Sequence, residues 1–206
     1  MTPTPDPHGP DQHGTDPNGN DRLGTVLRDG DRIALRYERD LDHPPERVWR
    51  ALTESASLQH WFPADIVGER AAGAAIELPF WPEGAAESLT ELEAAGVDTS
   101  TMDLDEALPG EIRVFDPPSC FEFVWGNPEG AADVLRFDLE SRGDRTRLVF
   151  TTWPGEPGPM GHPGTAAGWH VCLAELIALL DGRGAGGPDR ADMMGRELRE
   201  RYAGLI

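Results

Sequence analysis

The chain has 206 residues, enough for one domain of ordinary size with tails. Its formal net charge of −19 repels nucleic acid and anionic membrane surfaces, which excludes both as natural partners. All 18 basic residues are arginine, so Schiff-base chemistry and a phosphate-loop lysine are excluded as well.

The two cysteines, Cys120 and Cys172, lie inside apolar segments rather than in a spaced framework. This pattern predicts reduced core residues and a cytoplasmic protein. No apolar run approaches the length of about 18 residues that a membrane span needs, and the N-terminus lacks the pattern of a signal peptide. Because a highly acidic chain resists self-association, we expect a monomer or a weak homodimer.

The N-terminal segment is rich in proline, glycine and aspartate. It has almost nothing to bury, so residues 1–24 are predicted to be disordered. Its regularly spaced aspartates could suggest calcium, but the acidic ligand that closes an EF-hand loop is missing. No histidine or cysteine cluster elsewhere has metal-ligand spacing, so neither a metal nor a cofactor is predicted.

A second biased segment spans residues 83–107, which include eight acidic residues and no basic residue. Leu89 and Leu92 could lie on one face of a weak amphipathic helix. We interpret the segment as an acidic insertion between strands. Two roles remain open for it, a solvated excursion or a lid over a binding site.

Between these segments, apolar residues alternate as they do in half-buried strands. The alternation is clear at Ile33, Leu35 and Tyr37, and residues 142–144 have the composition of a hairpin turn. The predicted strands cover residues 32–38, 66–69, 74–78, 110–115, 120–125, 135–139 and 148–153.

Two short helices are predicted directly after the first strand. Val48, Trp49 and Leu52 form the buried stripe of one, and the other covers residues 57–62 before Pro63 ends it.

The most regular pattern is that of a long helix at residues 163–180. Trp169, Leu173, Leu176 and Leu180 recur at the spacing of one helical face, and a glycine stop follows. The order of elements is that of an α+β helix-grip fold, in which a curved antiparallel sheet wraps around one long C-terminal helix.

The domain is predicted to span residues 25–182. Residues 183–206 are predicted to form a linker and a short terminal helix that packs on the domain. The apolar residues of that helix are Met193, Met194, Leu198 and Tyr202.

Specific motifs accompany this order of elements. Between residues 24 and 181, the chain resembles one branch of the SRPBCC superfamily, named after the activator of the heat-shock-protein-90 ATPase. The segments that carry the resemblance are residues 43–53 with 58–62, 115–118, 123–125, 143–149 and 167–170. The resemblance implies a helix-grip fold with an internal apolar cavity for a small hydrophobic ligand. Families that share the fold bind lipids or plant hormones, cyclise polyketides, or sequester toxic natural products.

Large rings beside a cavity offer flat apolar contact, and tryptophan adds a polar group. The candidate ligand-binding residues are Trp61, Phe62, Phe80, Trp81, Phe123, Trp125, Phe137, Trp169, His170 and Leu173. His170 is also the only candidate catalytic residue, because a histidine beside an apolar cavity can serve as a base or as a polar anchor. The commoner role of such a histidine is structural.

The leading hypothesis is a binding protein that carries or sequesters an apolar or aromatic small molecule. The first alternative is a cyclase- or hydrolase-type enzyme acting on an aromatic natural product, with His170 as base or anchor. The second alternative is a co-chaperone-like protein that contacts a chaperone. No converging nucleophile, base and charge-stabilising group is apparent, which favours binding over catalysis.

Overall fold

The computed structural model of the chain describes residues 22–29, 32–82, 89–90, 92–94, 96, 98–100, 106–127, 131–155, 160–183 and 188–206. Most of the N-terminal segment that is predicted to be disordered lies outside the described residues. Much of the acidic insertion lies outside them too, although residues 89–90 and 92–94 are helical, where the two leucines predict a helix.

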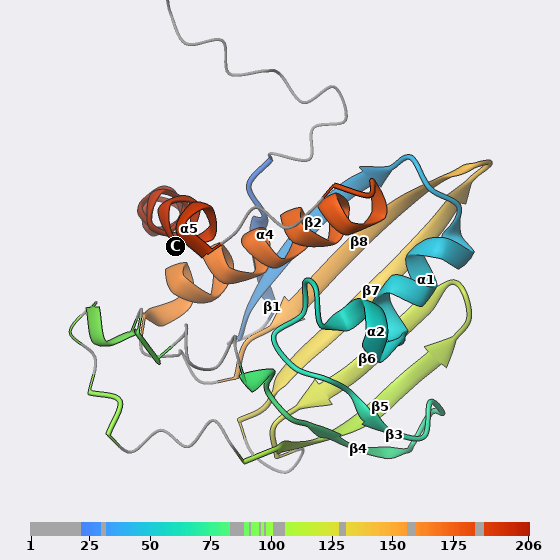
Figure 1. Ribbon diagram of the computed structural model, residues 1–206, viewed down its shortest axis with the longest axis horizontal. Helices are drawn as coiled ribbons and strands as arrows, with labels where there is room; N and C mark the ends of the chain where they lie inside the picture. The colour runs from blue at the N-terminus through green and yellow to red at the C-terminus, as the bar shows by residue number, and fades with distance from the viewer. Residues whose placement is uncertain are drawn as a thin grey trace, which may run out of the picture.

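One curved antiparallel sheet contains the eight strands of the described residues in the order β1-β2-β8-β7-β6-β5-β4-β3, and it is open at β1 and β3 (Figure 1). The strands are β1 (Thr25–Asp29), β2 (Arg32–Leu41), β3 (Val67–Gly68), β4 (Ala75–Leu78), β5 (Leu108–Asp116), β6 (Cys120–Trp125), β7 (Asp133–Arg142) and β8 (Arg145–Trp153).

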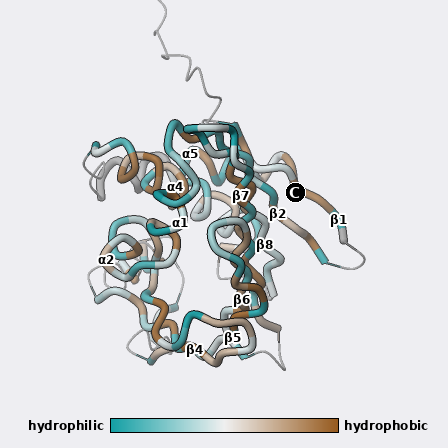
Figure 2. Tube along the Cα trace, turned by 90° about the vertical axis from the view of Figure 1, so that its right-hand side faces the viewer, coloured by the Kyte–Doolittle hydropathy of each residue, from teal (hydrophilic) through white to brown (hydrophobic). Residues whose placement is uncertain are grey.

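The helices cover one face of this sheet, as the side view in Figure 2 shows. Helices α1 (Pro45–Thr53) and α2 (Ser55–Leu58) follow β2, and the long helix α4 (Gly161–Leu180) follows β8. A final helix, α5 (Pro188–Ala203), packs against α4. The predicted helix-grip α+β fold is therefore confirmed.

Two elements differ from the sequence prediction. Strand β1 was not predicted: it is an edge strand that pairs only with β2. Its sequence, TVLRD, does not alternate apolar and polar residues as a half-buried strand does, and its Leu27 is 41% exposed. The second short helix lies earlier than predicted, at α2, and residues 59–61 form a turn that brings Trp61 and Phe62 toward the sheet.

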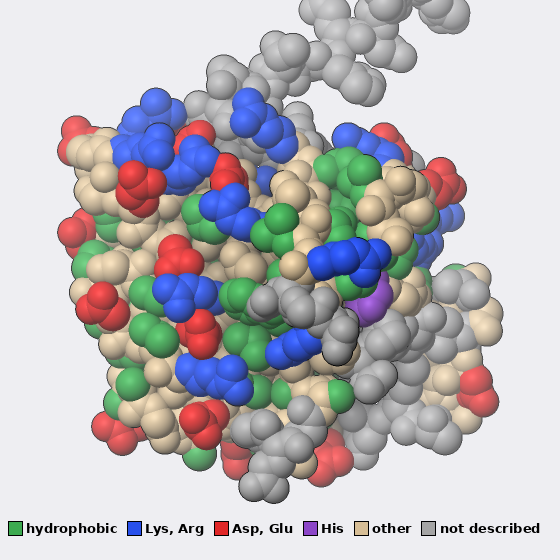
Figure 3. Space-filling view, turned by 180° about the vertical axis from the view of Figure 1, so that it is seen from behind, with side chains coloured by type: hydrophobic (Ala, Val, Ile, Leu, Met, Phe, Trp, Pro, Cys, Tyr) green, Lys and Arg blue, Asp and Glu red, His purple; other side chains and the backbone are tan. Residues whose placement is uncertain are grey.

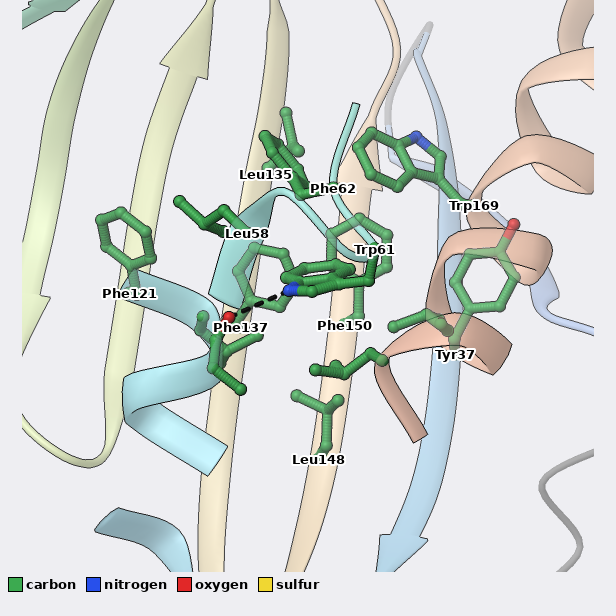
Figure 4. Close-up of a cluster of buried hydrophobic side chains, with 14 of the residues drawn as sticks. Tyr37, Leu58, Trp61, Phe62, Phe121, Leu135, Phe137, Leu148, Phe150 and Trp169 are labelled. Carbon is green, nitrogen blue, oxygen red and sulfur yellow. Dashed lines mark hydrogen bonds between the residues drawn. The ribbon is translucent and has the colours of Figure 1, made fainter. Parts of the chain in front are cut away.

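A row of aromatic rings crosses the concave face of the sheet (Figure 4). In register across four neighbouring strands lie Tyr37 of β2, Phe150 of β8, Phe137 of β7 and Phe121 of β6. Neighbouring rings stack, with centroids 5.8, 4.6 and 6.5 Å apart. We call these four residues the aromatic row. They are side chains of the alternating inward positions, which a half-buried strand must cover with another layer.

The helical layer docks onto the aromatic row ring by ring. Trp49 of α1 packs edge-on against Phe121 with centroids 6.2 Å apart, and Trp61 packs against Phe137 at 6.1 Å. Trp169 of α4 lies 5.0 Å from Phe150. Each such pair adds about 0.5–1.5 kcal/mol to the stability that ring burial itself provides.

Helix α4 ends where the sequence predicts. Gly182 adopts a positive φ of 68°, and the amides of Gly182 and Arg183 donate to the carbonyls of Leu179 and Ala178. This pair of bonds is the Schellman arrangement, which satisfies carbonyls that the helix leaves open.

Among the described residues, α4 alone is long and apolar enough to cross a bilayer. In this fold it lies along the concave face of the sheet, where Leu173 and Leu176 are fully buried. Its apolar character is therefore that of a core helix.

Two glycines give a matched test of the packing. A Cβ at Gly110 in β5 would lie 2.4 Å from the Val124 carbonyl oxygen, whereas a Cβ at Gly168 on the exposed side of α4 would meet nothing within 4 Å. We expect Gly110→Ala to destabilise the fold by about 2 kcal/mol, because a close-packed site must shift. Gly168→Ala should stabilise it by up to about 1 kcal/mol through helix propensity. Urea denaturation of the two variants measures both effects, and equal midpoints would contradict the described packing.

Candidate functional site

Seven of the aromatic residues proposed from the sequence are brought together at one end of the concave face. We call them the ring cluster. They are Trp61, Phe62, Phe80, Phe123, Trp125, Phe137 and Trp169.

Phe62 is the centre of the ring cluster. Its ring centroid lies 5.2 Å from that of Trp61, 5.3 Å from Trp125, 5.7 Å from Trp169 and 6.1 Å from Phe123. These neighbours come from a turn, a strand and the long helix, so the cluster exists only in the folded chain.

Local hydrogen bonds orient the rings that come from loops. The indole nitrogen of Trp61 donates to the Ala51 carbonyl in α1 at 2.9 Å, as the dashed line in Figure 4 shows. Trp81 is tied to the cluster through its indole nitrogen, which donates to the Phe62 carbonyl at 2.9 Å. Both bonds pair a buried or half-buried indole with a backbone carbonyl.

Phe80 of the ring cluster and the neighbouring Trp81 come shortly before the acidic insertion in the chain. Both are half-buried, and the Phe80 ring lies 5.6 Å from that of Trp125. Residue 80 also forms an isolated bridge with Ala64, next to the buried turn. The insertion therefore starts at the rim of the cluster.

The rings of the cluster contact one another between the sheet and the helices. Two hollows lined by described residues lie elsewhere. One, of about 30 Å³, lies beside His43 and Asp181 at the end of α4. The other, of about 340 Å³, lies on the outer face of the sheet between Arg32, Arg113 and Val134. Figure 3 shows that outer face, where arginine and acidic side chains alternate over the strands.

His170 lies apart from the ring cluster. It is 5% exposed, and its aromatic neighbours are Tyr37 and Tyr202. Its Nδ1 lies 3.1 Å from the Tyr202 hydroxyl, which also accepts a hydrogen bond from the Gly24 amide at 2.7 Å. The Tyr37 hydroxyl donates to the Ala166 carbonyl. This network joins α5 and the start of β1 to α4.

Burial, together with the smaller effect of the nearby positive charges of Arg39 and Arg201, lowers the pKa of His170 from 6.5 to about 3. The imidazole is therefore neutral at pH 7. A general base works best with a pKa near the operating pH, so this environment suits a structural hydrogen bond better than proton transfer.

The remaining candidates have simple environments. Leu173 is fully buried on α4. Burial raises the pKa of the Cys172 thiol to about 12 and that of Cys120 to about 11, so both thiols stay protonated at neutral pH. Among the described residues, no three His, Cys, Asp or Glu side chains gather where they could hold a metal ion.

Sequence reasoning did not include Phe150 and Tyr37 among the site residues, although each contacts a residue that it did include. Their alternation placed them correctly on the inner face of strands. The strand register that sets them beside α4 could not be obtained from alternation.

The family model described as "Activator of Hsp90 ATPase homolog 1-like protein" matches residues 42–181. A comparison with curated protein sequences found no significant match.

Similar solved structures extend over most of the chain. EF2215 from Enterococcus faecalis, a conserved protein of unknown function, has a TM-score of 0.63 at 18% identity, covering 92% of this chain and 94% of its own. CalU16 from Micromonospora echinospora has a TM-score of 0.58 at 17% identity, with coverages of 89% and 94%. BPP1335 from Bordetella parapertussis has a TM-score of 0.58 at 24% identity, with coverages of 86% and 89%. At these identities the likeness shows a shared fold.

The depressed pKa of His170 predicts a specific loss of stability in acid. The unfolded chain takes up a proton below pH 6.5, whereas the folded chain resists protonation down to about pH 3. Stability from this group is thus present above pH 6.5 and falls by about 1.4 kcal/mol per pH unit below it. The His170→Gln variant lacks this pH-dependent contribution. Between pH 7 and 5, the free energy of unfolding of the wild type should therefore fall by about 2 kcal/mol more than that of the variant. Urea denaturation at both pH values measures the difference. Parallel losses in the two proteins would contradict the described environment.

Proposed function

Because the chain belongs to the activator of Hsp90 ATPase homolog 1-like family, we propose that it is a binding protein for an apolar or aromatic small molecule. The family and the fold fit ligand-binding or polyketide-cyclase-like proteins. The ligand is held at the ring cluster, between the sheet and α4, where the protein carries or sequesters it.

The convergence of aromatic rings at one end of the concave face supports this proposal most directly. Trp125 comes from β6, Phe137 from β7, Trp169 from α4, and Phe62 from the turn after α2. Stacked and edge-on rings present flat apolar surfaces, which favour a planar apolar guest. The acidic charge of the chain favours a neutral guest over an anionic one.

Entry takes place at the rim of the cluster. Phe80 and Trp81 are half-buried there, whereas Phe62 and Phe123 beneath them are buried. Since the rings of the cluster contact one another, a ligand that enters replaces some ring–ring contacts by ring–ligand contacts of the same kind. The cost of entry is the movement of the rim side chains.

Binding is preferred over catalysis because no residue of the ring cluster carries an ionisable side chain. His170, the candidate base, faces Tyr37 and Tyr202. We also propose a reducing, cytoplasmic location, which fits two free cysteines.

Indole N–H resonances provide a test that needs no destabilising variant. We expect the fluorescent aromatic amine 1-aminoanthracene to bind the purified chain and to shift the indole N–H signals of Trp125 and Trp169. The signal of Trp49 should stay in place, since its ring packs on Phe115 and Phe121. Single Trp→Phe variants assign the signals in ¹H–¹⁵N spectra, and fluorescence titration gives Kd.

The proposal fails if the probe does not bind, or if it shifts the Trp49 signal and leaves those of Trp125 and Trp169 unchanged. Native mass spectrometry of the complex gives the number of probe molecules bound, and one per chain is expected.

A further inference from the structure

On strands β6 and β8, two buried polar atoms of the concave face have no hydrogen-bond partner among the described residues. They are Nε1 of Trp125 and Oγ1 of Thr152. Buried donors in native proteins are nearly always satisfied, so each exception calls for a physical explanation. Trp125 belongs to the ring cluster, and Thr152 is fully buried.

Other indoles of the same region show that the fold satisfies such donors where it can. The nitrogens of Trp61 and Trp81 each donate to a backbone carbonyl at 2.9 Å. The indole of Trp125 is surrounded instead by the rings of Phe62, Phe80 and Trp169. None of these side chains offers an oxygen acceptor.

Strand register places Thr152 at the same end of the sheet. Phe123 of β6 lies opposite Leu135 of β7, which lies opposite Thr152 of β8. Trp125 follows Phe123 by two residues and therefore shares its face. Trp169 contacts Trp125, and it also contacts Phe150, two residues before Thr152 on the same face of β8. Both unsatisfied atoms are thus on strands that the Trp169 ring covers.

We propose that the ligand of the ring cluster is a planar aromatic ketone or quinone, whose carbonyl oxygen accepts a hydrogen bond from Trp125 Nε1. This inference rests on the proposed function and specifies its ligand class. An indole nitrogen is a donor only, so its partner must be an acceptor. A neutral carbonyl provides one without adding negative charge to a chain whose net charge is already −19. The Thr152 hydroxyl serves a second polar group of the same ligand.

The matched probes are 9-fluorenone and fluorene, which share one planar skeleton and differ by a carbonyl in place of a methylene. We expect the unaltered chain to bind fluorenone about tenfold more tightly than fluorene, as a site with a buried donor rejects an analogue that lacks the acceptor. Trp125→Phe removes the donor and keeps a ring. It should weaken fluorenone binding by about tenfold and leave fluorene binding within about twofold.

Trp49→Phe is the control variant, since Trp49 packs at the other end of the sheet on Phe115 and Phe121. It should leave both affinities unchanged. In the unaltered chain, the indole proton of Trp125 should also move downfield with fluorenone and not with fluorene, a readout that does not depend on the folding of any variant.

The outcomes separate this inference from the function on which it rests. If both probes bind the unaltered chain equally, or if Trp125→Phe weakens both alike, the ketone assignment is wrong and the binding function stands. If neither probe binds, the binding function itself is contradicted, and the ligand assignment fails with it.

Discussion

The rest of the structure depends on the contact between the aromatic row of the sheet and the aromatic side chains of the helical layer. A curved sheet with one apolar face must be covered by a second layer of structure. Here each ring of the aromatic row is contacted by a ring of the helical layer. The contacting pairs include Tyr37 with His170, Phe150 with Trp169, and Phe137 with Trp61. Because these contacts fix where α4 and the turn after α2 lie, they also bring the ring cluster together.

Polar groups divide the concave face into two regions with different chemistry. At one end, His170, Tyr202 and the Gly24 amide form a network whose hydrogen bonds are internal, and burial keeps the imidazole neutral. At the other end, Trp125 and Thr152 present polar atoms without internal partners among rings. The first arrangement stabilises the docking of α5 onto α4. The second leaves hydrogen-bonding capacity for a guest.

Family membership and side-chain chemistry answer different questions about this protein. The family model and the solved relatives agree on the helix-grip fold, which many unrelated activities share. The proposed ligand class comes instead from particular atoms, above all the indole nitrogen of Trp125. The sign of the chain's charge disfavours the anionic members of that class.

The amino-acid sequence by itself determined the fold class, the inward residues of most strands and the span of α4, because periods of 2 and 3.6 are local properties of the chain. It also predicted the seven members of the ring cluster as ligand-binding residues, a role that stays a prediction. Only the tertiary structure decided that Phe150 contacts two of them, since strand register sets its partners. It also decided that β1 forms, since an exposed edge strand lacks the pattern of burial. The tertiary structure also places the His170 imidazole within hydrogen-bond distance of the Tyr202 hydroxyl, and it leaves the Trp125 indole nitrogen without an acceptor among the described residues. Hydrogen-bond partners depend on what distant segments bring to the same point, and spacing along the chain does not contain that information.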